Sequence, residues 1–311
     1  MKEQITIAFP VYKRTDYFRT ALDSAVNQTV KCKILVVDNN SPHDEFKKII
    51  EEYNNPLIEY IKTSETVNQD ENFNNCIRNV KTPWMTILHD DDYLHIQYVE
   101  LAEKIIKEYG DKIGGFAVEN HVSVEEWAGA NEKVKLTDDI VHVKPTFFYF
   151  RQLTPFPGVL FRTQLGLDIN GFDVPLHPIA DLDFWRRLTE NSTMLFVNQK
   201  MAYYRISPNQ STNRLIDDMV NNVYKYRLNL IRKRKVKNNL LTRFGVEYVR
   251  LINLDFFKSQ YPHLDITQDY PNAGWMKFTR IITKAKLFAK LFDWYIRKLC
   301  FDTRFIISPK I

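Results

Sequence analysis

Strand-like and helix-like segments alternate through the first third of the chain, and this alternation constrains the fold more than any other feature. Apolar runs typical of strands cover residues 4–9, 33–38, 58–61 and 84–88, and helical patterns cover residues 15–27, 45–53, 71–80 and 97–109. The continuous apolar run 34–37 suits a strand that is buried on both faces of a parallel sheet. Strands that alternate with helices of this length predict β-α-β units and an open α/β sheet. We expect Thr15 to cap the first helix and Gly110 to end the fourth.

The second half of the chain is less regular. We expect strands over residues 114–124, 194–197 and 201–204, an irregular polar stretch over 125–144, and a short helix over 181–190. Helical patterns rich in Lys, Arg and aromatic residues dominate from about Leu215. Residues 214–311 carry 20 Lys and Arg against 8 Asp and Glu, although the whole chain has a net charge of only +5. A basic tail on an acidic body suggests a polyanionic partner, either a membrane surface or nucleic acid.

Composition excludes several classes of protein. The contents of 44% hydrophobic and 26% charged residues are ordinary for a soluble globular protein. The cysteines, Cys32, Cys76 and Cys300, are too widely spaced to indicate a disulfide framework or a cysteine zinc site. No charged-then-apolar leader precedes Ile5, and no apolar run reaches the ~18 residues that a membrane-spanning helix needs. We therefore expect a cytoplasmic protein.

Three adjacent carboxylates, Asp90, Asp91 and Asp92, follow directly after the strand-like run 84–88. Open α/β folds bind ligands at the carboxyl ends of their strands. Adjacent carboxylates repel one another, and a divalent cation such as Mn²⁺ or Mg²⁺ relieves that repulsion through oxygen ligands. A cation held there would bind a diphosphate. The alternative is a solvated acidic loop, which is the commoner meaning of an acidic triplet, but the position directly after an apolar strand favours the functional interpretation.

Two further loops follow predicted strands of the same sheet. The first loop, residues 9–14, has no GxGxxG pattern, and the chain has no GxxxxGK[ST] pattern, so the sequence does not indicate a glycine loop for phosphate. Tyr12 in this loop either stacks on a nucleotide base or is only an aromatic residue at the rim. The second loop, residues 37–42, contains Asp38 and Asn39. Such residues favour turns by bonding their own backbone, and they also suit an acceptor for the imide proton of a pyrimidine.

Several ordered segments together resemble glycosyltransferase family two, which has the GT-A fold. They are FPVYKR at residues 9–14, SAVNQT at 24–29, KILVVDNNS at 33–41, NQDENFNNCI at 68–77 and WMTILHDDDYL at 84–94. The family typically shows P-x-Y-N-R, then S-x-x-x-Q-T, a VVDDGS-like turn and an LDADD-like acidic motif. A weaker similarity follows at GFD, residues 171–173, and at IADLDFWRRL, residues 179–188. The resemblance covers about residues 4–213 and leaves the tail outside.

The resemblance implies transfer of a sugar from a nucleotide-diphosphate sugar to a hydroxyl of a glycan or lipid-linked acceptor, with a divalent metal and with inversion at the anomeric carbon. The donor-binding residues that it implies are Pro10, Val11, Tyr12, Arg14, Asp38, Asn39 and Asp90. It implies a metal site at the acidic motif, with Asp91 and Asp92 as ligands. Two registers compete there: a literal D-x-D made of Asp90 and Asp92, or Asp91 as the main ligand with His89 at the position of the family's first Asp. The flanking leucines favour the second register.

The resemblance also implies that Asp181 is the general base, with Asp183 as the alternative. Inversion needs one carboxylate on the acceptor side, which takes the proton of the attacking hydroxyl. Asp181 is equally suited to cap the helix that follows, and the two roles are compatible. Ala180 and Ser207 stand where the family usually has Glu and His. Arg205 is expected either to pair with phosphate or to form a surface ion pair.

We therefore predict a GT-A-type α/β fold with a Rossmann-like, mixed, mainly parallel sheet flanked by helices. Residues 1–115 would form the nucleotide-sugar-binding half, 116–214 the acceptor-binding and catalytic half, and 215–311 a basic helical extension. Residues 275–300 interleave apolar and basic residues at helical spacing, which suits either the inner face of the cell membrane or packing on the core. The aromatic content of this tail argues against nucleic acid. The alternatives are a non-catalytic binding protein of this fold and a sugar nucleotidyltransferase, whose Gly-rich first loop the chain lacks.

Overall fold

The computed structural model describes residues 4–151, 156–206, 211–233, 242, 244–248, 250, 294–295 and 298–302. The chain forms two units. The first unit contains residues 1–142, 154–206 and 305–311, and the second contains residues 143–153 and 207–304.

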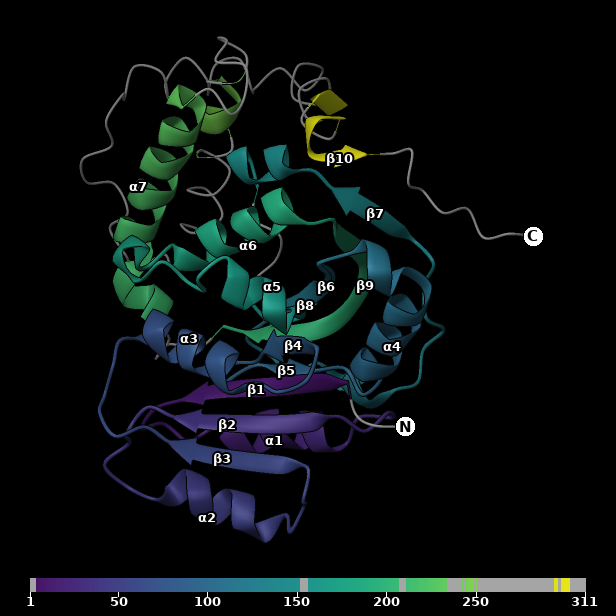
Figure 1. The fold of residues 1–311 in the computed structure, drawn as a ribbon, viewed down its shortest axis with the longest axis vertical. Coiled ribbons are helices and arrows are strands. Elements are labelled where there is room, and N and C mark those ends of the chain that lie inside the picture. The colour runs from purple at the N-terminus through teal and green to yellow at the C-terminus, as the bar shows by residue number, and fades with distance from the viewer. Residues whose placement is uncertain are drawn as a thin grey trace. The chain divides into compact units, whose positions relative to one another are not determined.

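The first unit begins with the predicted alternation of strands and helices (Figure 1). Its elements are β1 (Ile5–Val11), α1 (Phe18–Val26), β2 (Lys33–Asp38), α2 (Glu45–Glu52), β3 (Ile58–Lys62), α3 (Gln69–Asn79) and β4 (Trp84–Ile87). Strand β1 pairs in parallel with β2 and β4, and β2 pairs in parallel with β3. The β-α-β reading of this region is therefore confirmed.

The remainder of the first unit extends the same sheet with strands of both directions. Its elements are β5 (Tyr93–Leu94), α4 (Tyr98–Tyr109), β6 (Gly115–Ser123), β7 (Ile140–Val143), β8 (Val159–Arg162), α5 (Thr163–Asp168), α6 (Ala180–Asn191) and β9 (Met194–Arg205), with short 3₁₀ turns at Gly110–Lys112, Ala128–Asn131 and Val174–Leu176. Strand β8 is antiparallel to β4 and β6, whereas β6 and β9 are parallel. The strand order is β7-β9-β6-β8-β4-β1-β2-β3, with β5 paired to β9. This mixed, mainly parallel sheet confirms the predicted fold class.

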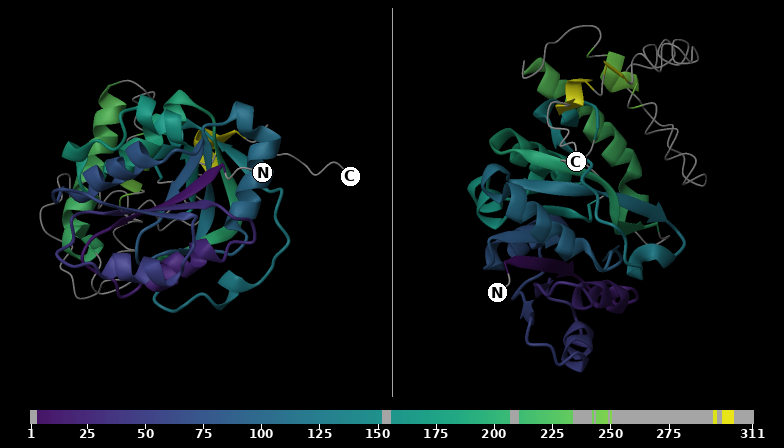
Figure 2. Two further views of the ribbon diagram at one scale, coloured as in Figure 1. Left: turned by 60° about the horizontal axis from the view of Figure 1, so that its bottom comes forward. Right: turned by 90° about the vertical axis from the view of Figure 1, so that its right-hand side faces the viewer.

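The handedness of the crossovers decides which face each helix covers. The chain moves from β1 to β2 to β3 in one direction and then returns past β1 to β4. Because such crossovers are right-handed, α1 and α2 cover one face and α3 covers the other (Figure 2, left). Phe9 on β1 packs edge-on against Phe18 of α1 at 5.9 Å between ring centroids, and Phe18 packs against Phe46 of α2 at 5.0 Å. These rings lie in the main hydrophobic core.

Three local expectations differ from the structure. Helix α1 starts at Phe18 and its N-cap is Tyr17, without a side-chain cap, so the predicted Thr15 cap is wrong. The hydroxyl of Thr15 instead donates to Glu45. The two strands predicted over 194–204 are one strand, β9, whose pairing with β6 is interrupted by register shifts. Strand β7 lies in the stretch expected to be irregular, so that expectation is wrong there; its four residues, Ile140–Val143, were too short a pattern to identify.

In the second unit, α7 (Ser211–Arg232) confirms a helix in the basic tail, and β10 (Phe301–Asp302) follows much later. A turn of 3₁₀ helix, Pro145–Tyr149, packs beside α7, and the guanidinium of Arg227 donates to the carbonyl of Phe148 at 3.2 Å. The amphipathic segment predicted over 275–300 lies outside the described residues except at 294–295 and 298–300. Within the described part of the chain, none of the helices combines the length and apolarity needed to cross a bilayer.

Candidate active site

Three loops meet where β1, β2 and β4 reach their carboxyl ends. Parallel pairing puts these ends at one edge of the sheet. The backbone N–H of Lys13, after β1, donates to the hydroxyl of Ser41, after β2, at 2.9 Å. Arg14 reaches the loop after β4, where its Nη2 donates to Asp90 at 3.0 Å and to Asp91 at 2.7 Å. The structure thus brings the three loops together, as their position in the sequence predicted.

The acidic loop after β4 contains a set of side chains arranged like metal ligands. One ligand atom from each of His89, Asp91 and Asp92 lies within 4.8 Å of the others. Among the described residues, His89 Nε2 and Asp92 Oδ2 are buried without a hydrogen-bond partner. An imidazole with two carboxylates is a donor set that suits a divalent metal such as Mn²⁺. These residues therefore fit a metal ion, and Asp90 lies outside the set.

The electrostatics of this loop also favour a bound cation. Burial, together with the negative charge of Asp91, raises the pKa of the Asp90 carboxyl to about 6. Burial raises the pKa of Asp92 to about 6 as well, although contact with His89 acts in the opposite direction. A divalent cation would be the largest local charge and would keep these carboxylates ionised.

The ring of His89 is held by aromatic neighbours. It stacks on Phe73 of α3 at 5.4 Å and packs against Phe156 at 4.4 Å, both between ring centroids. Burial opposes protonation of this imidazole, but the carboxylates beside it outweigh burial and raise its pKa. The sequence reading took His89 only as a departure from the family motif. Its position directly before the Asp triplet was the feature of the sequence from which a role as a metal ligand could have been predicted.

Arg205, at the end of β9, is hydrogen-bonded to the acidic loop. Its N–H donates to Asp92 Oδ1 and its Nε donates to the carbonyl of Asp91, both at 2.9 Å. Its guanidinium also pairs with Glu126 at 2.6 Å and lies 4.2 Å from the ring centroid of Tyr17. Arg205 therefore forms an ion pair, as one interpretation expected, but with its own side chain only 5% exposed and with Glu126 61% exposed.

The expected nucleotide-binding residues lie around the same edge. Pro10 and Val11 end β1, and Tyr12 after them is 38% exposed. Asp38 is fully buried, and its two carboxylate oxygens accept hydrogen bonds from the Ser41 N–H at 2.9 Å and the Tyr60 hydroxyl at 2.7 Å.

Asn39, the next residue, is bonded to the backbone of Val67 through both atoms of its amide, at 2.8 and 2.9 Å. Asp38 therefore holds the turn through Ser41, as the turn interpretation expected, whereas Asn39 ties the turn to the backbone of Val67, which is distant in the sequence.

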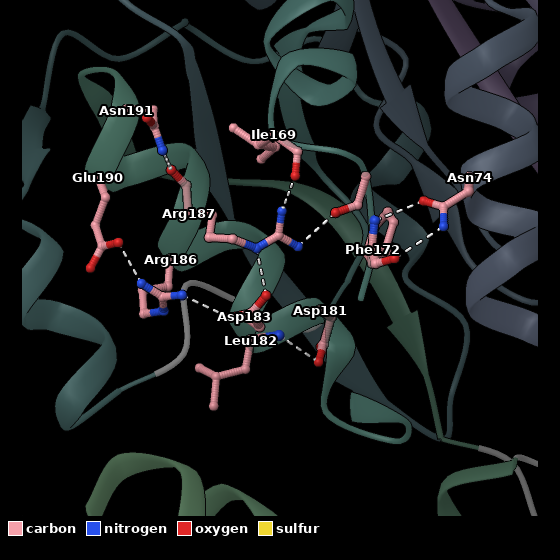
Figure 3. A network of polar contacts seen from close by, with 11 residues as sticks. Asn74, Ile169, Phe172, Asp181, Leu182, Asp183, Arg186, Arg187, Glu190 and Asn191 are labelled. Atoms are coloured by element: carbon pink, nitrogen blue, oxygen red, sulfur yellow. Dashed lines mark hydrogen bonds and ion pairs between the residues drawn. The ribbon is translucent and has the colours of Figure 1, made fainter. Parts of the chain in front are cut away.

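Asp181 is the second residue of α6 and points into the start of that helix (Figure 3). Its Oδ1 accepts the N–H of Leu182 at 2.7 Å. The N-cap of α6 is Ile179, so Asp181 is not the cap that one interpretation made it. Burial raises the pKa of Asp181 to about 6; the Leu182 N–H acts against this shift, and the charge of Asp70 adds to it.

Asp183, two residues on, lies in an ion-pair network (Figure 3). Its Oδ1 accepts from Arg186 at 2.8 Å and its Oδ2 from Arg187 at 2.5 Å. Arg187 in turn donates to the carbonyls of Ile169 and Gly171, just before α6. The Asp183 side chain is 6% exposed. Its contacts tie the helix to the preceding turn.

Helix α3 contributes two polar residues that the sequence reading missed. Asn74 donates to the carbonyl of Phe172 at 3.0 Å and accepts its N–H at 2.7 Å, which fixes the turn before α6 on α3 (Figure 3). Asp70, which is buried, hydrogen-bonds the ring of His177 at 2.8 Å. Burial raises the pKa of Asp70 despite that contact. Both lie in the segment 68–77 that resembles the family, where the density of Asn and Asp in a helical pattern was a further signal.

Known proteins with a similar sequence include several that are named as glycosyltransferases. An uncharacterised glycosyltransferase of Rickettsia typhi is 23% identical over 232 residues, which are 69% of this chain and 68% of that protein. Glycosyltransferase GlyA of Streptococcus pneumoniae is 33% identical over 129 residues, which are 41% of this chain but only 18% of that protein.

Known structures share the fold at low sequence identity. S. aureus TarS 1-349 in complex with UDP-GlcNAc is 14% identical with a TM-score of 0.60, covering 95% of this chain and 83% of that one. Mannosyltransferase PcManGT of Pyrobaculum calidifontis, in complex with GDP-Man and Mn²⁺, is 12% identical with a TM-score of 0.59, covering 96% of this chain and 86% of that one. The fold is thus that of the GT-A glycosyltransferases. The family model described as "Glycosyl transferase family 2" matches residues 6–164, about half of the chain, and the chain belongs to that family.

Proposed function

We propose that this chain is a metal-dependent, inverting glycosyltransferase that moves a sugar from a nucleotide-diphosphate sugar to a hydroxyl of a glycan or lipid-linked acceptor. The observation that carries the proposal is the pairing of two features in one unit. One is the ligand set His89, Asp91 and Asp92, and the other is a carboxyl with a raised pKa, Asp181. The charge of His89 acts to lower the pKa of Asp181. The ring of His89 packs against Phe156, which stacks on Phe172 shortly before α6.

The donor is a nucleotide-diphosphate sugar. Structures with the same fold were determined with UDP-GlcNAc and with GDP-Man, which supports this class of donor without choosing the nucleotide. Pro10, Val11 and the exposed ring of Tyr12 frame the nucleoside. Asp38 and Asn39 act by holding the turn beside it, since their side chains are already bonded within the protein.

The diphosphate binds at the acidic loop. His89, Asp91 and Asp92 would hold a divalent cation, which would supply positive charge for the negative charge of a leaving diphosphate. Arg205 keeps the backbone of this loop in place through Asp91 and Asp92. Arg14 and Asp90 lie at the outer side of the set, next to Asp91.

Asp181 takes the proton of the acceptor hydroxyl. A pKa of about 6 leaves the carboxylate ionised at neutral pH and still basic enough to accept a proton. Asp183 is less suited, because both of its oxygens are bound to guanidinium groups, which favour the ionised form over the protonated one. A single carboxylate on the acceptor side, opposite the leaving diphosphate, corresponds to one displacement and therefore to inversion.

The acceptor class and the membrane contact through residues 275–300 stay predictions. A basic, aromatic-rich segment of that kind would bring the enzyme to the inner face of a membrane that carries lipid-linked acceptors. No role for nucleic acid is proposed.

The test separates metal binding from proton transfer. Wild-type protein, Asp92→Asn and Asp181→Asn are titrated calorimetrically with UDP and GDP, with and without Mn²⁺, and turnover is followed as release of nucleoside diphosphate from the corresponding sugar donors. Asp92→Asn should lose metal-dependent nucleotide binding. Asp181→Asn should keep that binding and lose about 10²–10⁴-fold in turnover. Asp168→Asn, an exposed carboxylate on α5, is the matched control. Equal loss of nucleotide affinity in both site variants would refute the assignment of roles.

A further inference from the structure

We propose that Arg14 is an internal counter-cation of the acidic loop, which a divalent metal displaces and which then turns to the diphosphate of the donor. The proposal rests on the function proposed above, because it concerns the same metal-binding residues. It assigns Arg14 two successive partners: first the carboxylates, and then the phosphate groups.

The first partner is visible in the contacts. Arg14 Nη2 lies 2.7 Å from Asp91 Oδ2 and 3.0 Å from Asp90 Oδ1. Asp91 also belongs to the set of ligand atoms gathered within 4.8 Å, whereas Asp90 does not. The Arg14 guanidinium is therefore bound to Asp91, which a metal ion would need as a ligand, and also to Asp90, which lies outside the ligand set.

The two arginines at this loop differ in their freedom to move. Arg205 is 5% exposed, is tied to the backbone of the loop and has its own carboxylate partner in Glu126. Arg14 follows a strand end, its side chain is 27% exposed, and both of its ion pairs go through a single nitrogen. Since a guanidinium carries five N–H donors in a fork, Arg14 keeps donors that suit a phosphate group. Arg14 is the cation that can leave.

Electrostatics makes the two cations compete. A divalent ion on Asp91 would lie within a few ångströms of the guanidinium that Asp91 also holds, and like charges at such distances repel strongly near a protein surface. A bound metal therefore weakens the ion pairs of Arg14 with Asp90 and Asp91. A diphosphate that attracts Arg14 weakens the same ion pairs. By linkage, the metal then raises the affinity for the diphosphate, and the diphosphate raises the affinity for the metal.

The experiment measures Mn²⁺ binding directly, by the loss of the free-ion electron paramagnetic resonance signal. Titrations compare wild-type protein with Arg14→Gln, which removes the competing charge. Arg14→Met repeats the test if the Gln variant does not fold. Arg19→Gln is the matched control, because it removes one guanidinium from an exposed ion pair with Glu52 on the neighbouring helices.

Without nucleotide, Arg14→Gln should bind Mn²⁺ about tenfold tighter than wild type or better, and Arg19→Gln should match wild type. With saturating UDP or GDP, whichever binds, wild type should gain Mn²⁺ affinity by a larger factor than Arg14→Gln does. If Arg14 exchanged no partner and only changed the local charge, nucleotide would raise the Mn²⁺ affinity of wild type and Arg14→Gln by the same factor. A smaller factor in Arg14→Gln therefore identifies the exchange.

Two results would overturn the proposal in different ways. Equal or weaker Mn²⁺ binding by the neutral Arg14 variants, while Asp92→Asn still abolishes binding, would leave the metal site intact and refute the exchange alone. Absence of Mn²⁺ binding in wild type and in every variant, with UDP and with GDP, would refute the metal-dependent function and the exchange together.

Discussion

Replacing the proposed base, Asp181→Asn, should make the folded protein more stable at neutral pH while it abolishes most of the turnover. The pKa of Asp181 rises from 3.8 to about 6 in the folded protein, chiefly because the carboxyl is buried. The folded state thus binds a proton more tightly than the unfolded state does. Stability from this group is fully present below pH 3.8 and is lost as the pH rises through about 6. Asn is neutral at every pH and avoids the loss.

The magnitude follows from the size of the shift. A shift of about two pKa units corresponds to about 3 kcal/mol at 1.36 kcal/mol per unit. Partial exposure of the side chain screens this energy, and loss of a negative charge at the start of α6 removes about 0.3–1 kcal/mol of favourable interaction with the helix dipole. The amide oxygen of Asn can still accept the N–H of Leu182. We expect a net gain of about 1–2 kcal/mol, or about 2–8 °C in melting temperature at pH 8.

Thermal unfolding of wild type and Asp181→Asn from pH 8 to pH 4 tests this reasoning, with Asp168→Asn as the exposed control. The stability difference should be largest at pH 8 and should shrink steadily toward pH 4. A variant that is less stable than wild type at pH 8, or a difference that does not depend on pH, would refute the argument that burial raises the pKa of this carboxyl.

Two further predictions concern the rate and the turn before α6. Turnover with saturating donor and metal should fall as the pH drops through about 6, because Asp181 is then protonated; nucleotide titrations at the same pH values check that binding persists. Gly171→Ala should destabilise the protein by about 2 kcal/mol or more, measured by urea unfolding, because Gly171 has φ of +61° and a Cβ there would lie 2.1 Å from Asn74 Oδ1. Wild-type stability of this variant would mean that the Asn74 contacts to Phe172 contribute little.

Local sequence patterns were sufficient to predict the alternation of strands and helices in the first third of the chain and the edge of the sheet where three of its loops meet. Apolar runs of strand length and helical periodicity arise from neighbours in the chain, so β1 to β4 and the helices between them were found within a few residues. Parallel strands share one edge for their carboxyl ends, so the loops at Tyr12, Asp38 and Asp91 were expected to meet. The one long strand β9 was split in two because its polar middle, at Asn198–Lys200, interrupts the apolar pattern.

Side-chain partners depend on residues far apart in the chain, and only the tertiary structure decided them. The sequence by itself determined an α/β sheet with an acidic loop at its carboxyl edge, because those features follow from local periodicity. It did not determine that Arg14 binds Asp91, seventy-seven positions away, or that Arg205 is buried beneath the same loop. Nor did it determine that, of Asp181 and Asp183 in α6, Asp183 is the one that forms ion pairs with arginines. Such contacts depend on distance and burial in the folded chain. A charged side chain that is removed from water must be paired or hydrogen-bonded, and the packing of the folded chain decides which groups are close enough to do so.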